Sequence, residues 1–248
     1  MEQAIGHALT WLAKFPLEIE ARFVLAPLLH RQELTGANLD LAVSYAIDWL
    51  ADYLDTEDAE FLLKRLLPRS PLPEGRIRVL KQLAVNQLRI RVKDVDDEGV
   101  SFLFRPWLHC RVRHADLDHE IVLLACDWLR ANLTREGIDF VFNRILRQKD
   151  LPDSDWLVAA QIASDWLSTS KRSFRDTDFA VNSLLTRSSI APHPVLVNII
   201  RRGHGLLKNM PNPKEREHLK VRLRRALESL PVGDPLLAEA GILLDKPD

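Results

Sequence analysis

The chain has 248 residues, 46% hydrophobic and 28% charged, with a formal net charge of −1 at pH 7. This composition predicts a folded protein whose overall charge favours no particular partner. No stretch approaches the roughly 18 apolar residues that span a bilayer, and Glu2 stands where a signal peptide would have Lys or Arg. Two cysteines do not make a disulfide scaffold. We therefore expect a cytoplasmic protein that does not insert into membranes.

A short motif recurs along the chain at a nearly constant spacing. Its second copy reads Ala46-Ile47-Asp48-Trp49-Leu50, and the four full copies begin at Ala8, Ala46, Ala125 and Ala163. The step from the first copy to the second (46 − 8 = 38) equals the step from the third to the fourth (163 − 125 = 38). A degenerate copy begins at Ala84, one further step after the second (84 − 46 = 38). A fixed period of this size indicates a repeat array.

Each repeat is expected to contain two helices. In the second repeat, apolar residues recur every three to four positions from Leu39 to Tyr53, as one face of a helix requires. Thr56 is the expected N-cap of the next helix, which prolines end after Leu67. The second helices share an aromatic residue with an apolar pair beginning five positions later; these aromatics are Phe23, Phe61, Phe102, Phe140 and Phe179.

These patterns predict an all-α fold, an α-solenoid of about six antiparallel helix pairs with a terminal helix. We expect one domain, 1–248, with units at about 1–38, 39–75, 76–116, 117–154, 155–193 and 194–232, and a terminal helix at 233–248. The sixth unit lacks the motif and is strongly basic. Apolar residues at both ends indicate either a segment of a longer array or end-to-end self-association.

The motif itself predicts structure. Ala, Trp and Leu at positions i, i+3 and i+4 share one side of a helix. A small Ala lets a neighbouring helix approach, and the Trp fills the space between successive units. We expect these tryptophans to form the core; the alternative is an aromatic groove that stacks a ligand.

No catalytic or cofactor-binding pattern is present in the sequence. It contains no Gly-rich phosphate loop ending in Lys-Ser/Thr, no Gly-x-Ser-x-Gly nucleophile turn and no His-Glu-x-x-His zinc pattern. We therefore predict a protein that is not an enzyme and needs no cofactor or metal.

One cluster of His, Arg and Cys is a candidate binding site. Three His and two Cys fall between positions 109 and 126, and these are residue types that zinc prefers, although the spacing matches no common structural site. Cys126 lies inside the repeat motif and is expected to be a core thiol. The cluster is interpreted as a solvated connector or as an anion or partner site; that site would consist of His109, Arg111, Arg113 and His114.

Charge is unevenly distributed along the chain. Residues 1–60 contain eleven Asp or Glu and three Lys or Arg, whereas residues 199–230 contain nine Lys or Arg and three Asp or Glu. Solvated helix faces explain this uneven distribution. The alternatives are head-to-tail attraction between molecules, or between parts of a longer array, and nucleic-acid binding. The candidate binding residues in the basic unit are Arg201, Arg202, Lys220, Arg222, Arg224 and Arg225.

The pattern resembles HEAT and tetratricopeptide repeats, although its period is longer than the roughly 34 residues of the latter. More narrowly, Ala-x-Asp-Trp-Leu followed by Phe23-Val24-Leu25-Ala26-Pro27-Leu28-Leu29 is similar to helical repeats of bacterial STAND-type signalling and defence proteins. That resemblance implies the sensor or interaction part of a larger system. We expect a scaffold that binds a protein or peptide; the alternative is a nucleic-acid-binding repeat using the basic unit.

Overall fold

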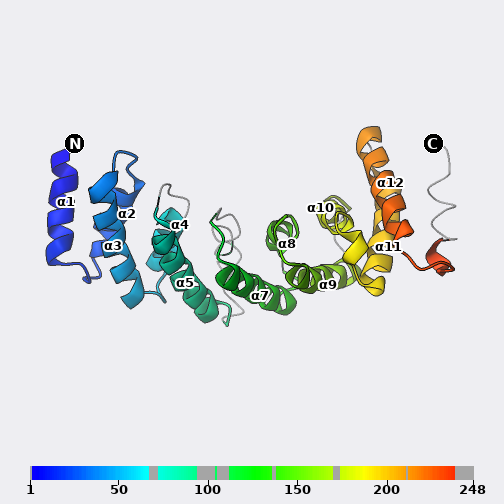
Figure 1. Ribbon diagram of the computed structural model, residues 1–248, viewed down its shortest axis with the longest axis horizontal. Coiled ribbons are helices and arrows are strands. Elements are labelled where there is room, and N and C mark those ends of the chain that lie inside the picture. The colour runs from blue at the N-terminus through cyan, green and yellow to red at the C-terminus, as the bar shows by residue number, and fades with distance from the viewer. Residues whose placement is uncertain are drawn as a thin grey trace. The chain divides into compact units, whose positions relative to one another are not determined.

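The computed structural model describes residues 2–66, 72–93, 104, 112–135, 138–169, 174–210 and 212–237. Over these residues the chain is helical and contains no β-strand, which confirms the predicted all-α class (Figure 1). None of the helices described there is long and apolar enough to cross a membrane. The chain forms two compact units, Met1–Leu124 and Ala125–Asp248.

Unit 1 is built from helices that contact both the next helix and the next but one. They are α1 (Glu2–Lys14), α2 (Ala21–His30), α3 (Gly36–Asp52), α4 (Glu57–Leu66), α5 (Glu74–Arg91) and the first part of α7 (Ala115–Ala131). Helix α1 packs against α3, and α3 against α5, while α2 packs against α4. Helix α2 also packs against α3, and α4 against α5. The helices therefore form two rows.

Local sequence sets the helix boundaries. The Thr56 hydroxyl accepts a hydrogen bond from the Ala59 N–H at 3.2 Å, as the predicted N-cap of α4 should. Glu57, Asp58 and Glu60 occupy the first turn of α4, where the helix dipole favours negative charge. Helix α3 begins at Gly36, whose φ of 57° lies in the left-handed region that other residues rarely adopt.

The repeated tryptophan forms the core of unit 1, which confirms its structural interpretation at this position. Trp49 is fully buried, and its indole N–H donates to the Glu18 carbonyl at 3.1 Å. The ring stacks on Tyr53 with centroids 4.7 Å apart, and the Tyr53 hydroxyl donates to the Leu17 carbonyl at 2.8 Å. Helix α3 therefore holds the backbone of the α1–α2 connector. Trp11, at the equivalent position of the first copy of the sequence motif, is only half-buried.

A buried ion pair joins α5 to the start of α7. Lys81 is fully buried, and its ammonium donates to Asp118 Oδ1 and to the Val112 carbonyl, each at 2.6 Å. The other oxygen of Asp118 accepts the His114 backbone N–H at 2.9 Å. A buried charge is tolerated when it is paired and hydrogen-bonded in this way. The contact fixes the direction in which the chain enters α7.

Unit 2 continues with helices that repeat the packing pattern of unit 1. After the end of α7 come α8 (Ile138–Leu146), α9 (Asp153–Thr169), α10 (Phe174–Leu185), the short 3-10 helix η1 (Ser188–Ile190), α11 (His193–Asn209) and α12 (Pro213–Glu228). Helix α8 packs against α9 and α10, and α9 against α11. Helix α12 packs against α10 and α11.

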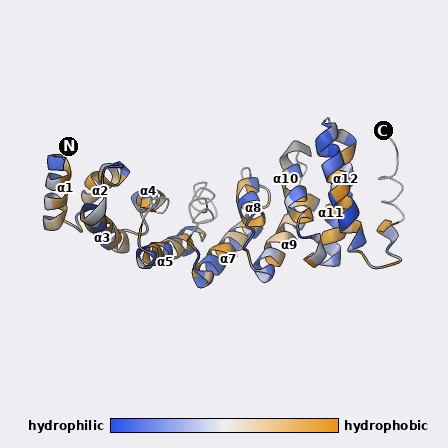
Figure 2. Ribbon diagram, turned by 45° about the horizontal axis from the view of Figure 1, so that its top comes forward, coloured by the Kyte–Doolittle hydropathy of each residue, from blue (hydrophilic) through white to orange (hydrophobic). Residues whose placement is uncertain are grey.

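Tryptophans also fill the core of unit 2. Trp128 and Trp166, from two copies of the motif, are buried, and Trp156 joins them. The Trp166 ring lies 5.3 Å from the ring centroid of Phe142. The basic α12 still buries one face, and Figure 2 shows hydrophobic residues among its hydrophilic ones. At Gly203 on α11, an added Cβ would lie 2.6 Å from a methyl group of Leu223, so glycine permits this close approach.

Replacing Trp49 by Ala should lower the free energy of unfolding by about 3–5 kcal/mol, because it removes a buried ring and leaves a cavity. The same change at Trp11 should cost clearly less, because that ring is already partly exposed. Urea denaturation followed by circular dichroism measures both variants. Equal losses at the two positions would contradict the core assignment of Trp49.

Candidate functional site

Two phenylalanines at equivalent repeat positions point outward from unit 1. Phe23 on α2 is 66% exposed and Phe61 on α4 is 46% exposed. They lie one repeat step apart in the sequence (61 − 23 = 38). Leu28 and Leu29, the apolar pair that follows Phe23, are buried instead. In α2, therefore, the apolar pair faces inward and the aromatic residue faces outward.

An arginine covers each of these rings. The Arg22 guanidinium lies 4.6 Å from the Phe23 ring centroid, and that of Arg65 lies 4.4 Å from the Phe61 centroid. Both distances are within the range of cation–π contacts. Arg22 also forms an ion pair with Asp58 of α4. Arg65 is hydrogen-bonded to His30 Nδ1 of α2 at 2.6 Å. Each arginine thus links α2 to α4 while it lies over a phenylalanine.

The connector before α2 adds apolar surface. Phe15, Leu17 and Ile19 are all exposed, although Trp49 and Tyr53 fix the backbone of the same segment. Several exposed large apolar side chains within a few residues are typical of an interaction surface. We call Phe15, Leu17, Ile19, Phe23 and Phe61, with Arg22 and Arg65, the aromatic face of unit 1.

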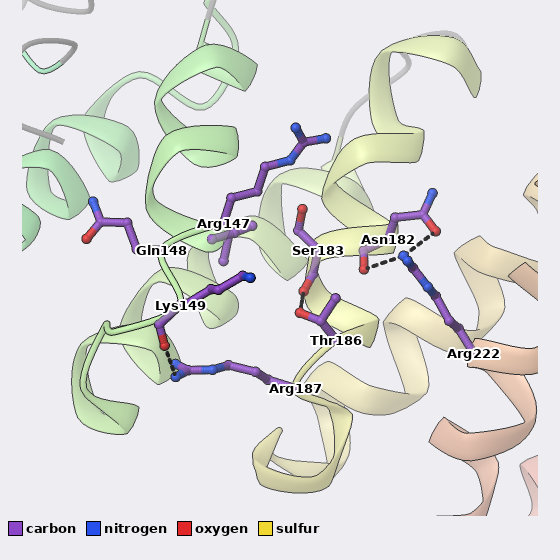
Figure 3. A pocket seen from close by; sticks show the side chains of 9 residues that line it. Arg147, Gln148, Lys149, Asn182, Ser183, Thr186, Arg187 and Arg222 are labelled. Atoms are coloured by element: carbon purple, nitrogen blue, oxygen red, sulfur yellow. Dashed lines mark hydrogen bonds between the residues drawn. The ribbon is translucent and has the colours of Figure 1, made fainter. Parts of the chain in front are cut away.

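Unit 2 contains a cationic pocket of about 480 Å³. It lies between the end of α8 with the following connector, α10 and α12 (Figure 3). Its lining residues are Leu146, Arg147, Gln148, Lys149, Asn182, Ser183, Thr186, Arg187 and Arg222. Four of them carry positive charge, and none carries a carboxylate. The volume is within the range of ligand-binding pockets.

Two of the four cations are held by the protein. Arg187 donates to the Leu151 carbonyl at 2.9 Å and to the Lys149 carbonyl at 3.2 Å. Arg222 donates to the Asn182 carbonyl at 3.4 Å and to its side-chain oxygen at 3.1 Å. The other two, Arg147 and Lys149, are exposed at the rim of the pocket. In Figure 3 the Lys149 side chain extends toward Ser183 of α10 and Thr186, which follows that helix.

The structure brings one predicted binding residue, Arg222, into this pocket. The others in the basic unit do not line it; they are Arg201, Arg202, Lys220, Arg224 and Arg225. Arg201, Arg224 and Arg225 are exposed, whereas Arg202 and Lys220 are half-buried. A binding role for these five stays a prediction.

The predicted anion or partner site around position 111 is described only in part. His109 and Arg111 lie outside the described residues. Arg113 is exposed, whereas His114 is buried, and neither of its ring nitrogens has a hydrogen-bond partner among the described residues. A site formed by these four residues stays a prediction.

Sequence reasoning missed Arg147, Lys149 and Arg187. A usable signal was present, because Lys149 and Arg187 lie one repeat step apart (187 − 149 = 38) and meet through the hydrogen bond to the Lys149 carbonyl. Basic residues one repeat step apart, near neighbouring second helices, are brought together by the packing of α8 against α10. The same reasoning applies to Phe23 and Phe61.

Cys126 is a buried thiol. It is fully enclosed in α7, and burial raises its pKa to about 12. Within the described parts of the chain, no group of His, Cys, Asp and Glu has the arrangement of a metal site. A protonated thiol is a poor nucleophile and a poor metal ligand, so Cys126 serves in packing.

No protein-family model, curated protein sequence or solved structure matches the chain. The resemblance to bacterial signalling and defence repeats therefore stays a prediction.

In a Cys110→Ser chain, Cys126 should resist a thiol reagent at about pH 8 while the protein is folded, because its raised pKa keeps the thiolate population low. Unfolding in urea should expose the thiol, return its pKa to about 8.5 and allow complete reaction. The rate of the Cys126 reaction is measured with a disulfide reagent that releases a coloured thiolate, whose absorbance is followed with time. Equal rates with and without urea would contradict the buried assignment.

Proposed function

We propose that this chain is a non-catalytic helical-repeat scaffold, an α-solenoid with a step of about 38 residues, that binds a protein or peptide partner. The aromatic face of unit 1 is the proposed binding surface. The observation that carries the proposal is the outward placement of Phe23 and Phe61 at equivalent positions of successive repeats, each under an arginine.

Contacts one repeat apart support the solenoid part of the proposal. In unit 1, Arg22 and Asp58 pair across a separation of 36 positions. In unit 2, Arg187 reaches the Lys149 carbonyl across 38 positions, and Asn198 donates to Ser164 across 34. Stacked repeats contact their neighbours at separations of this size.

The connectors before the first helices repeat as well. Leu34 precedes α3 and Leu72 precedes α5, and both side chains are buried. They lie one step apart (72 − 34 = 38). Equivalent buried residues at equivalent connectors support a regular step between the units.

A solenoid should tolerate loss of one whole step. Deleting residues 35–72 removes one step and joins Leu34 to Pro73, so that Leu34 takes the place of Leu72 in front of α5. We expect unchanged helix content per residue and a cooperative unfolding transition. Deleting only residues 35–53 removes α3, against which α1, α2 and α5 pack, and cooperativity should be lost. If both deletions unfold the chain equally, the repeat step is wrong.

The composition of the aromatic face is that of a protein-binding surface. Aromatic residues and Arg are enriched at the centres of interfaces, where a few of them supply most of the binding free energy. Arg22 and Arg65 are already positioned by Asp58 and His30. Binding therefore requires little further ordering of these side chains.

Charge indicates the kind of partner. Residues 1–60 have a net charge of −8, from eleven acidic and three basic residues. A segment carrying Lys or Arg beside apolar side chains would complement this field and cover the exposed rings. We propose such a segment of another protein as the partner, and a bacterial signalling or defence system as the setting; the resemblance of the repeat motif supports that setting.

The double variant Phe23→Ala/Phe61→Ala should bind such segments about 30-fold more weakly, because it removes two hot-spot rings. Peptides are first selected from a random library on the wild-type chain, and their affinities are then measured by fluorescence anisotropy. We expect the selected peptides to combine apolar residues with Lys or Arg.

Val79→Ala is the matched control, because Val79 is an exposed apolar residue of unit 1 outside the aromatic face. This variant should bind the selected peptides like the wild type. Selected peptides that bind the double variant with unchanged affinity would show that the aromatic face is not the binding surface.

A further inference from the structure

The cationic pocket of unit 2 has features beyond those of the proposed protein-binding surface. We propose that it binds a phosphate monoester. This inference rests on residues of α8, α10 and α12 and of the connectors that follow α8 and α10, and it is independent of the aromatic face.

Charge is the first reason. Arg147, Lys149, Arg187 and Arg222 line one pocket of about 480 Å³, and no carboxylate lines it with them. Arg187 has an ion pair with Asp153 at 3.8 Å, but Asp153 lies outside the lining. Like charges gathered in this way repel one another unless an anion joins them. An anion of more than one charge therefore fits the pocket best.

Pre-organisation is the second reason. Arg187 and Arg222 are fixed by hydrogen bonds to protein oxygens, so their charges stay in place without a ligand. A guanidinium has five N–H donors, and these contacts use only some of them. Arg147 and Lys149 are exposed and free of such anchoring in the described contacts, so they can adjust to a bound group. Two of the cations are therefore in place before a ligand binds, and the other two can move to contact the bound anion.

The geometry favours phosphate over carboxylate. A phosphate monoester carries about −1.5 to −2 charges and three acceptor oxygens, and arginine clusters are the usual way to recognise it. A carboxylate has one charge and two oxygens and would leave part of the cluster uncompensated. Asn182, Ser183 and Thr186 add neutral polar groups to the lining. The pocket has room for the atoms that bear the phosphate.

Isothermal titration with phosphoserine, using the full chain at constant ionic strength, tests the proposal. The wild type should bind phosphoserine and should not bind serine. Arg147→Gln/Lys149→Gln should weaken phosphoserine binding by about tenfold or more, because each cation supplies a charge-assisted hydrogen bond. Both side chains are exposed, so the variant should keep the helix content of the wild type.

Lys214→Gln is the matched control, since Lys214 is an exposed cation of α12 that does not line the pocket. It should bind phosphoserine like the wild type. Equal weakening in the control and the double variant, or equal binding of serine and phosphoserine, would overturn the proposal. Tighter binding of an oligonucleotide without terminal phosphates than of phosphoserine would overturn the monoester assignment.

The phosphate monoester could belong to a phosphorylated protein or to a small metabolite, and the same titration distinguishes these two sources. A phosphoserine peptide that binds more tightly than free phosphoserine and glycerol 3-phosphate would assign the pocket to a phosphorylated protein. The reverse order would assign it to a small phosphorylated metabolite. Both results require the loss of affinity in Arg147→Gln/Lys149→Gln.

Discussion

Burial of Trp49 against the connector between α1 and α2 is the interaction on which unit 1 depends. The Trp49 ring fills the space between α3 and the α1–α2 connector, and its N–H holds the Glu18 carbonyl. Leu50 and Ala46 are also fully buried, so the inward face of α3 consists of packed apolar side chains. Core packing therefore sets few requirements for the outward face of the second helices. That face is where Phe23 and Phe61 lie, so the site is a consequence of how the core is filled.

Arginine plays the same part in both candidate sites. Arg22 and Arg65 bridge α2 and α4, and each lies over a phenylalanine. In unit 2, Arg187 ties the chain that follows α10 to the connector after α8, and Arg222 ties α12 to α10. A planar guanidinium can hold one partner and still present donors or a flat face to another. Contacts that join neighbouring helices thereby also position the side chains of both proposed binding surfaces.

The period of the sequence predicted much of the fold, including the all-helical class, the buried Trp49 and the N-cap at Thr56. It could not tell an inward aromatic from an outward one, because Phe23 and Leu28 are part of one apolar pattern and their sides of α2 follow from packing. It also gave no sign that Lys81 is buried, because its burial requires Val112 and Asp118, which lie 31 and 37 positions further along the chain. The pocket was missed for a similar reason. Its cations come from separate elements, and in the sequence each of them resembles an ordinary solvated surface residue.

The two candidate sites lie in segments of opposite charge, and this difference indicates which ligands each site can accept. Residues 1–60 carry a net charge of −8, whereas residues 199–230 carry +6. A nucleic acid would be repelled by the acidic segment that contains Phe23, and it offers no apolar side chains to cover exposed rings. A basic apolar segment would be repelled by the four cations around Arg222. No uniformly charged partner complements both surfaces, and the two proposals accordingly name two different ligands, a cationic peptide for unit 1 and a phosphate for unit 2.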